Sequence, residues 1–497
     1  MSVWNSDLPV TQVGANRPTV VYGDGLTDYE DAALARLWRT WCVKYERNRL
    51  RQDYYEGHVK VRNLKLAFKD ESIARQIKPR CGWPAKAVDM LAERSVFDYF
   101  VFTSEDGFAD LREAYEQNGW RELNALMTTS EITHSCAFYT VSAGDPDAGE
   151  PNVVISGYSA LNAAAVWDRR HKCIAYGMAI TDTDDDGKPT ALNLYTRDAV
   201  VEMVDLGNGE WHSERHAHSM GRPLMEPIVY KASLDRPMGR SRITRSVMSI
   251  TDNALREVMR TEIAGEIYTV PQRYFLNVDF SSLGENNFKT YWNSYFAVNA
   301  PDGSGTPSAG QFNPPGMNDH IVYMRSLAAQ FAGETGLPIS ALGVVSDNPS
   351  SAEAISEART ELVKDAERLN RANGAHLLNV ARLVVATSRG LTFAEAAELM
   401  QGTSTRFKPA DMPSRAVIAD ATLKEVQAIP QLAETKSVLS LLGHPDDEVE
   451  AIWAELGQVK GLELAEKLAE GLGQTTPPTF SASDEGTTDE PEQSATE

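Results

Sequence analysis

The chain has 497 residues, of which 42% are hydrophobic, and it carries 48 Lys and Arg against 70 Asp and Glu, a net charge of −22 at pH 7. This length supports a sizeable core and roughly three domains of about 150 residues. The charge has the wrong sign for a protein that grips nucleic acid by neutralising phosphates, and no apolar run approaches the roughly 20 residues of a membrane span. The four cysteines are too widely spaced to indicate a zinc or redox pair.

The N-terminal part is predicted to be mostly helical. Residues 1–26 are rich in Pro, Gly and Thr and indicate an extended arm. Thr27 and Glu30 have the spacing of a capping box, which predicts a helix that ends near Gly57. Further helical spacing covers residues 84–94 and 108–136.

The middle of the chain changes character twice. In residues 138–233, short apolar runs alternate with turn clusters, which predicts a meander of antiparallel strands. Helical spacing returns over residues 240–268 and again over 321–335. Between these two helices, residues 271–319 begin like a strand and then become rich in Pro and Gly. An irregular insertion of this length is usually functional or disordered.

The clearest predicted helix follows Ser350. We expect Ser350 to be its N-cap and Glu353 to be the capping-box partner, and apolar residues then recur with helical spacing to about Ser388. A helix of about 36 residues would be about 54 Å long. Because helices in compact domains average about 12 residues, this one favours a strut in a large assembly over part of a small enzyme.

The C-terminal region is predicted to be a helical unit with an acidic tail. Helical spacing covers residues 416–472, after Pro409 and Pro413. From Thr475 onward the chain contains acidic residues but no Lys or Arg. We expect this tail to be disordered and solvated.

An acidic cluster at Asp182–Gly187 has the composition of a calcium site. It opens like an EF-hand loop, with carboxylates at positions 1, 3 and 5 and Gly at position 6. The Glu that such a loop needs at position 12 is replaced by Asn193, and the flanking residues indicate strands. We therefore favour a solvated hairpin turn.

Three histidines, His212, His216 and His218, have residue types that bind zinc or nickel. In a strand, however, even-numbered positions share one face, so these residues are expected to form a polar face opposite Trp211. The nucleophile-elbow, dinucleotide-binding and P-loop motifs are absent from the sequence. The sequence therefore predicts neither an enzyme nor a cofactor site, and a metal-dependent enzyme remains a less favoured alternative.

Basic residues gather around the first central helix. They are Arg236, Arg240, Arg242, Arg245, Arg256 and Arg260. Such residues can contact phosphate when they are repeated around a ring, or they can form ion pairs. The acidic partners for such pairs would be Asp252, Glu257 and Glu262, or residues of a neighbouring subunit. We favour the ion pairs.

Short motifs occur in a fixed order along the chain. The most specific is the sequence TGLP at 335–338, followed by PSSAEA at 349–354. It is accompanied by segments at 53–57, 82–94, 239–243, 271–273 and 419–421. Over roughly residues 28–470, this order resembles the portal proteins of siphophages that infect Gram-positive and actinobacterial hosts.

The resemblance implies an α+β portal fold with mostly helical wing, stem and crown, a β-rich insertion in the wing and a mixed clip. The implied parts are an N-terminal arm (1–27), a wing that is helical and then β-rich (28–235), stem helix 1 (236–268), the clip (269–319), stem helix 2 (320–336), the tunnel loop (337–349), the long wing helix and its connection (350–408), the crown (412–474) and the acidic tail (475–497).

The resemblance also implies a function. A ring of twelve copies would occupy one capsid vertex and form a channel for packaging, retaining and ejecting double-stranded DNA. The terminase large subunit and then the head–tail adaptor would dock on it, and the major capsid and scaffolding proteins would be further partners. The protein would be part of the virion and would assemble in the host cytoplasm. A different head–tail connector or minor head protein is the main alternative.

Two groups of residues would then face the channel or a neighbouring subunit. In the tunnel loop they are Val344, Val345, Ser346, Asp347 and Asn348. This loop has one acid and no base, so the sequence predicts weak polar contact with DNA and no firm grip. In the stem they are the basic residues Arg240, Arg242, Arg245 and Arg256, expected to contact DNA or the next subunit.

Overall fold

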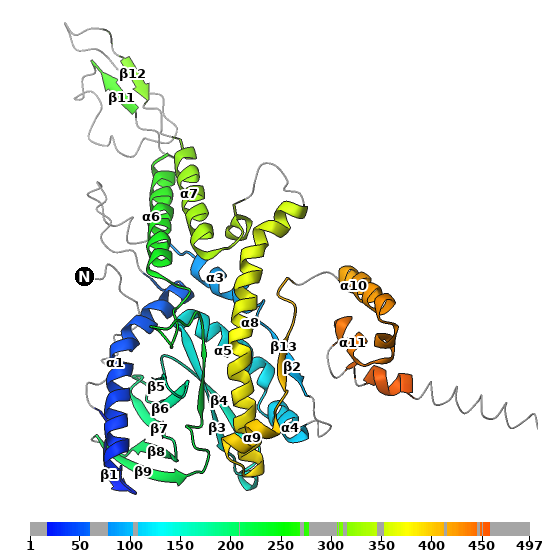
Figure 1. The fold of residues 1–497 in the computed structure, drawn as a ribbon. Coiled ribbons are helices and arrows are strands. Elements are labelled where there is room, and N and C mark those ends of the chain that lie inside the picture. The colour runs from blue at the N-terminus through cyan, green and yellow to red at the C-terminus, as the bar shows by residue number, and fades with distance from the viewer. Residues whose placement is uncertain are drawn as a thin grey trace, which may run out of the picture. The chain divides into compact units, whose positions relative to one another are not determined.

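A computed structural model describes the chain in several stretches (Figure 1). These are residues 17–59, 78–102, 108–207, 209–268, 273–277, 306, 308–311, 316–344, 352–411, 415–444, 448–449 and 451–457. The chain divides into two compact units, Met1–Met412 and Pro413–Glu497. The predicted acidic tail, 475–497, lies outside the described residues.

Helix α1 (Asp28–Glu56) begins and ends as the sequence predicts. The amide of Glu30 donates to Thr27 Oγ1 at 3.3 Å, and the amide of Thr27 donates to the Glu30 carboxylate at 2.9 Å. The helix ends at Gly57, whose φ of 69° is the left-handed conformation that glycine adopts most easily. The first half of α1 packs on a sheet through Leu34, Leu37, Trp38 and Trp41.

That sheet has six strands in the order β1-β9-β8-β7-β6-β5. The strands are β1 (Thr19–Gly23), β5 (Ala163–Asp168), β6 (Cys173–Thr183), β7 (Pro189–Tyr195), β8 (Ala199–Asp205) and β9 (Glu210–Ala217). All pairs are antiparallel except β1 with β9, which is parallel. Part of the predicted arm is thus the edge strand of this sheet.

A second sheet has the order β10-β3-β4. Its strands are β3 (Cys136–Ala143), β4 (Val153–Ser159) and β10 (Met225–Val229). The prediction of antiparallel strands in this region is confirmed, but they form two sheets instead of one meander. The first core cluster gathers between this second sheet and helices α5 and α8, with Phe138, Ile228 and Val384 among its buried residues.

The prediction of one helix over residues 108–136 is wrong, because this segment forms two helices. Helix α4 (Ala109–Gln117) stops at Asn118, and α5 (Trp120–His134) starts after Gly119, whose φ is 57°. The Asn118 side chain donates to the carbonyl of Ala114 at 2.7 Å and accepts from the amide of Ile155 at 2.8 Å. These bonds hold the break against β4. The preceding helix, α3 (Trp83–Ala92), lies where expected.

Helix α6 (Arg245–Tyr268) starts later than predicted. The residues before it are bonded to α5. Ser241 Oγ donates to the carbonyl of Thr133 at 2.5 Å, and the amide of Arg242 donates to the carbonyl of Ile132 at 2.9 Å. Helix α7 (Asn318–Thr335) ends at Gly336 as expected. Between α6 and α7, β11 (Arg273–Leu276) pairs with β12 (Ser308–Gln311), and most of the predicted clip lies outside the described residues.

Helix α8 (Ala352–Arg389) has 38 residues, which confirms the predicted long helix. Its N-terminal half buries Leu362 and Leu369 in one core cluster, and its C-terminal half buries Val380 and Val384 in another. Two elements after it were not predicted. They are α9 (Phe393–Leu399), and β13 (Ser404–Phe407), which pairs with β2 (Phe97–Val101).

The second unit is helical where it is described, as predicted. It contains α10 (Arg415–Ala428), a 3-10 turn at Pro430–Glu434, α11 (Ser437–Leu441) and helical residues at 451–457. Two further 3-10 turns, Pro146–Ala148 and Ile339–Leu342, belong to the first unit. The expected mixed class of helices and sheets is confirmed. Within the described stretches, no helix is both long and apolar enough to cross a membrane.

Candidate functional site at the base of a helix pair

Helices α6 and α7 pack side by side as an antiparallel pair (Figure 1). His320, at the start of α7, contacts Glu257 in the second half of α6, with 2.6 Å between His320 Nδ1 and Glu257 Oε1. Thr244, just before α6, donates to Glu334 near the end of α7 at 3.1 Å. The pair is therefore joined at both ends, and the insertion emerges between them at residues 269–317.

Arg242 lies at the base of this pair and is only 5% exposed. Its guanidinium donates to Asp365 Oδ2 in α8 at 2.7 Å, to the hydroxyl of Tyr230 at 2.8 Å and to the carbonyl of Thr335 at 2.6 Å. The last bond satisfies a carbonyl at the C-terminus of α7, where helix carbonyls have no partner within the helix. Arg242 thus ties α6, α7 and α8 together.

Asp365 also receives a bond from Lys231 Nζ, at 3.0 Å. Burial acts to raise the pKa of Asp365, but Lys231 and Arg242 outweigh it and hold the pKa below its usual value. The carboxylate is therefore ionised at neutral pH and forms ion pairs with both Lys231 and Arg242. Arg242 is consequently an internal ion-pair residue, and within one subunit it has no free surface to offer DNA.

The other predicted stem cations differ from one another. Arg260 pairs with Glu257 at 3.4 Å, and Arg256 donates to Asn253 Oδ1 at 3.2 Å. Arg240 and Arg245 are exposed. The ion-pair interpretation thus holds for Arg242 and Arg260, although Arg242 uses Asp365 in α8 and none of the acids suggested by sequence proximity.

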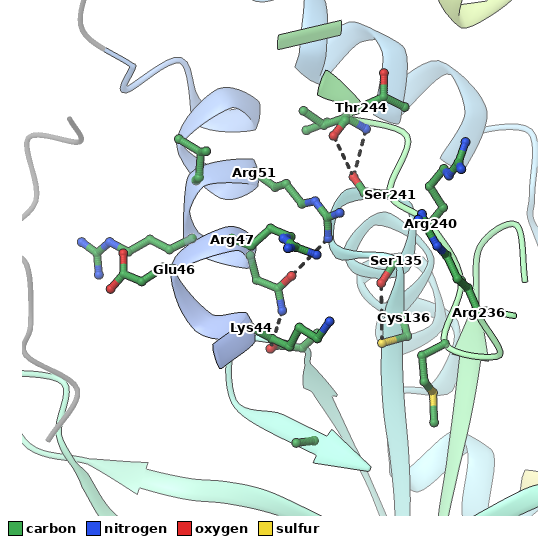
Figure 2. Close-up of a pocket in the computed structure, with 18 of the residues that line it drawn as sticks. Lys44, Glu46, Arg47, Arg51, Ser135, Cys136, Arg236, Arg240, Ser241 and Thr244 are labelled. Carbon is green, nitrogen blue, oxygen red and sulfur yellow. Dashed lines mark hydrogen bonds between the residues drawn. The ribbon is translucent and has the colours of Figure 1, made fainter. Parts of the chain in front are cut away.

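A cavity of 1310 Å³ lies beside this junction, between α1 and the chain that leads into α6 (Figure 2). Arg47 and Arg51 approach it from α1, and Arg236 and Arg240 lie on the opposite wall. The sequence predictions included Arg240 but not the α1 residues. A sequence pattern could have identified these α1 residues. Lys44, Arg47 and Arg51 are three and four positions apart, which places three cations on one helix face.

Arg51 is the most enclosed of these cations. It donates to the carbonyl of His134 at 2.7 Å and to Asn48 Oδ1 at 3.2 Å, both neutral acceptors. Burial, followed by the charge of Arg47, lowers the pKa of Arg51 to about 10. The cavity therefore holds a positive charge that its own hydrogen bonds do not neutralise, and an anion would stabilise it.

The two suspected metal clusters are separate surface features. Within Asp182–Gly187, the first two residues end β6 and Asp184–Gly187 form the turn to β7, where the amides of Asp186 and Lys188 donate to Asp184 Oδ1 at 3.1 and 2.7 Å. This confirms the predicted hairpin turn. His212 and His216 lie on the exposed face of β9, opposite buried Trp211, while His218 lies past the strand end. Among the described residues, no three His, Cys, Asp or Glu side chains are grouped to hold a metal.

The predicted tunnel loop is only partly described. Val344 is half-buried and packs against the core cluster that contains Leu342. Val345, Ser346, Asp347 and Asn348 lie outside the described residues, and so does Ser350. Glu353 belongs to α8, but its side chain is not among those described, so the predicted cap stays a prediction.

The fold combines an antiparallel helix pair, which flanks a long insertion, with an α+β body that contains a 38-residue helix. Comparison with known families is more specific. The family model described as "Phage portal protein, SPP1 Gp6-like" matches residues 34–462. The chain belongs to this family of phage portal proteins, which confirms the resemblance found in the motifs.

Individual relatives agree with the family match. The chain is 24% identical to the portal protein of Mycobacterium phage L5 over 417 residues, 82% of each chain. It is 25% identical to the portal protein of Mycobacterium phage D29 over 411 residues, 80% of this chain and 83% of that one. Among solved structures, chains from the virion of a native gene transfer agent particle and from the neck of an empty one match 73% of this chain and 90% of theirs. The identities are 13% and 14%, with TM-scores of 0.39 and 0.42.

Proposed function

We propose that copies of this chain form a ring-shaped channel at one capsid vertex, through which double-stranded DNA is packaged, retained and ejected. The observation that carries the proposal is the family match over residues 34–462. It is supported by the two mycobacteriophage portal proteins, which align with about four-fifths of the chain. In this proposal the protein is part of the virion and assembles in the host cytoplasm.

The helix pair supports a ring. Repeating an antiparallel pair around an axis builds a tube, and contacts between two different surfaces close into a ring when the rotation fits. Near the start of α7, Ile321, Val322 and Tyr323 are between 43% and 54% exposed. Apolar side chains that are adjacent and exposed suit burial against a neighbouring copy. We take the ring to have twelve copies.

The parts inferred from the sequence enter the proposal with α6 and α7 as the stem, the insertion between them as the clip and α8 as the long wing helix. The loop that contains Val345–Asn348 would face the channel. The terminase large subunit and then the head–tail adaptor would dock on the ring, which the major capsid and scaffolding proteins would surround.

Charge indicates how such a channel would treat DNA. The chain carries a net charge of −22, and the cation at the stem base, Arg242, is already neutralised by Asp365. An acidic channel wall repels the phosphates of DNA, so the DNA finds no position where it is strongly bound. The channel is therefore proposed to guide DNA by its shape, while a separate motor supplies the force.

Native mass spectrometry of the purified protein tests the ring. The 54.7 kDa chain should assemble into a closed species whose mass is twelve times that of the subunit. A chain that stays monomeric over a range of concentration and salt would contradict the proposal. Samples at high and low salt should be compared, because salt screens the repulsion between acidic subunits.

A further inference from the structure

The cavity beside α1 is positive although the chain is strongly negative. Seven basic side chains line it against four acidic ones, in a chain with a net charge of −22. The basic residues are Lys44, Arg47, Arg49, Arg51, Arg236, Arg240 and Arg245. A local excess of this sign in an acidic chain indicates a site for an anion.

Three of these cations have no acidic partner within the described part of the subunit. In the part of the chain that the structure describes, Lys44, Arg47 and Arg240 form no ion pair with a carboxylate. Arg51 is bonded to neutral acceptors, as described above. Glu46, which is counted among the lining acids, extends to the other side of α1 (Figure 2). Lys44, Arg47 and Arg240 are therefore available to an anion from outside the subunit.

The concave shape of the cavity favours some anionic ligands over others. A DNA duplex is a stiff rod, so it can meet the rim of a concave cavity but cannot enter it. A narrow protein turn that carries carboxylates can enter and reach guanidinium groups on both walls. Paired charges inside such a recess are shielded from solvent and interact more strongly than exposed pairs.

The β6–β7 turn has these properties. Asp182, Asp184, Asp185 and Asp186 are all exposed. Asp184 shapes the turn by accepting from two backbone amides. The carboxylates of Asp185 and Asp186 take part in no ion pair or hydrogen bond within the described chain. They are therefore available to an external cation.

We propose that the β6–β7 turn of one copy enters the basic cavity of the next copy, where Asp185 and Asp186 pair with Arg47 and Arg240. The inference rests on the ring proposed above. The turn and the cavity are different surfaces, so each copy offers one and receives the other. Such a heterologous contact can repeat from copy to copy around a closed ring.

Charge reversal tests the contact. One variant carries Arg47→Glu and Arg240→Glu, and a second carries Asp185→Lys and Asp186→Lys. Each should raise the concentration needed for half-maximal ring formation about tenfold, because attraction becomes repulsion. Combining all four substitutions should restore assembly to within about threefold of wild type. A matched control, Arg169→Glu with Arg170→Glu, changes exposed charge elsewhere and should have no effect.

The readout is mass photometry at 0.15 M salt, with circular dichroism to confirm that each variant is folded. If the cavity variant assembles like wild type, or if the combined variant is no better than either parent, the proposed contact is wrong. If the cavity variant loses duplex DNA binding while its rings are unchanged, the cavity is a phosphate site and the proposal is also wrong. A wild-type chain that forms no ring contradicts the proposed function itself, so the two failures are distinguishable.

Cross-linking gives a second measurement that does not depend on substitution. A carbodiimide joins an amine to a carboxylate that touches it, so rings should yield a peptide in which Lys44 is bonded to Asp185 or Asp186. In rings assembled from equal amounts of ¹⁵N-labelled and unlabelled chains, half of these peptides should contain one heavy and one light partner. If all of them contain partners of one isotope, the contact lies within a single copy and the proposal is overturned.

Discussion

At the scale of single residues, Arg242 has the clearest structural role. Replacing it by Ala leaves the Asp365 carboxylate, whose side chain is 14% exposed, with Lys231 as its one cationic partner among the described residues. Removing one partner of a buried ion pair typically costs about 3 to 5 kcal/mol. Arg242→Ala should therefore lower the free energy of unfolding by about 3 kcal/mol, measured by urea denaturation. Arg245→Ala, at an exposed position, is the control and should change it by less than about 0.5 kcal/mol.

Glu131 gives a prediction for pH. It is fully buried, and burial raises its pKa to about 8 despite the opposing hydrogen bond from Asn373. Because the folded state holds this proton more tightly than the unfolded state, the contribution of Glu131 to stability falls as pH rises from about 4.5 to about 8.

Glu131→Gln mimics the protonated acid and should remove that dependence. The stability of the variant relative to wild type should increase by about 1 kcal/mol for each pH unit between pH 5.5 and 7.5. Urea midpoints at three pH values measure this. A constant difference would show that Glu131 is ionised in the folded chain.

Residue-level features were predictable where they depend on neighbours in the sequence. The Thr27–Glu30 capping box and the turn at Asp182–Gly187 are of this kind. The pairs Arg242–Asp365 and Glu131–Asn373 join residues that are 123 and 242 positions apart. Such distant pairs leave no local sequence pattern. The acids suggested for Arg242 were therefore ones close to it in the sequence.

At the scale of elements, Gly374 in the middle of α8 deserves a test because glycine normally weakens a helix by about 1 kcal/mol relative to alanine. Here a Cβ would meet Thr405 Oγ1 of β13. Gly374→Ala should therefore destabilise the protein by about 1 kcal/mol, since overpacking outweighs the gain in helix propensity.

The control is Thr405→Ala, which removes the obstructing hydroxyl. In that background, Gly374→Ala should stabilise the protein by roughly the propensity difference of about 1 kcal/mol. Thermal unfolding of the four chains forms a double-mutant cycle. If Gly374→Ala stabilises the wild-type background as well, the contact between α8 and β13 is looser than described.

Helices with strong local patterns were predicted well. Helix α1 has a signal at each end, α7 has its stop at Gly336, and α8 has helical spacing along its whole length. Two errors have local causes: the Asn118-Gly119 break was overlooked, and α6 starts late because Ser241 and Arg242 bond to α5. The pairing of β1 with β9 and of β2 with β13 joins distant segments. Strand partners of this kind depend on the tertiary fold and have no signature in one strand alone.

At the scale of the whole molecule, the order of short motifs predicted the family, which the match over residues 34–462 confirms.

Most of the insertion between α6 and α7 lies outside the described residues, so its role is best tested by deletion. Removing residues 275–315 should leave ring formation intact and abolish binding of the head–tail adaptor, measured by co-sedimentation with purified rings. Loss of the ring itself would place the insertion in the subunit contacts.

The central claim is that copies of this chain surround a channel. Electron microscopy of the purified protein tests it most directly. Negatively stained particles should be annular, and their class averages should show a central hole wide enough for a DNA duplex. Particles that are solid, open-ended or strictly monomeric in every buffer would contradict the account.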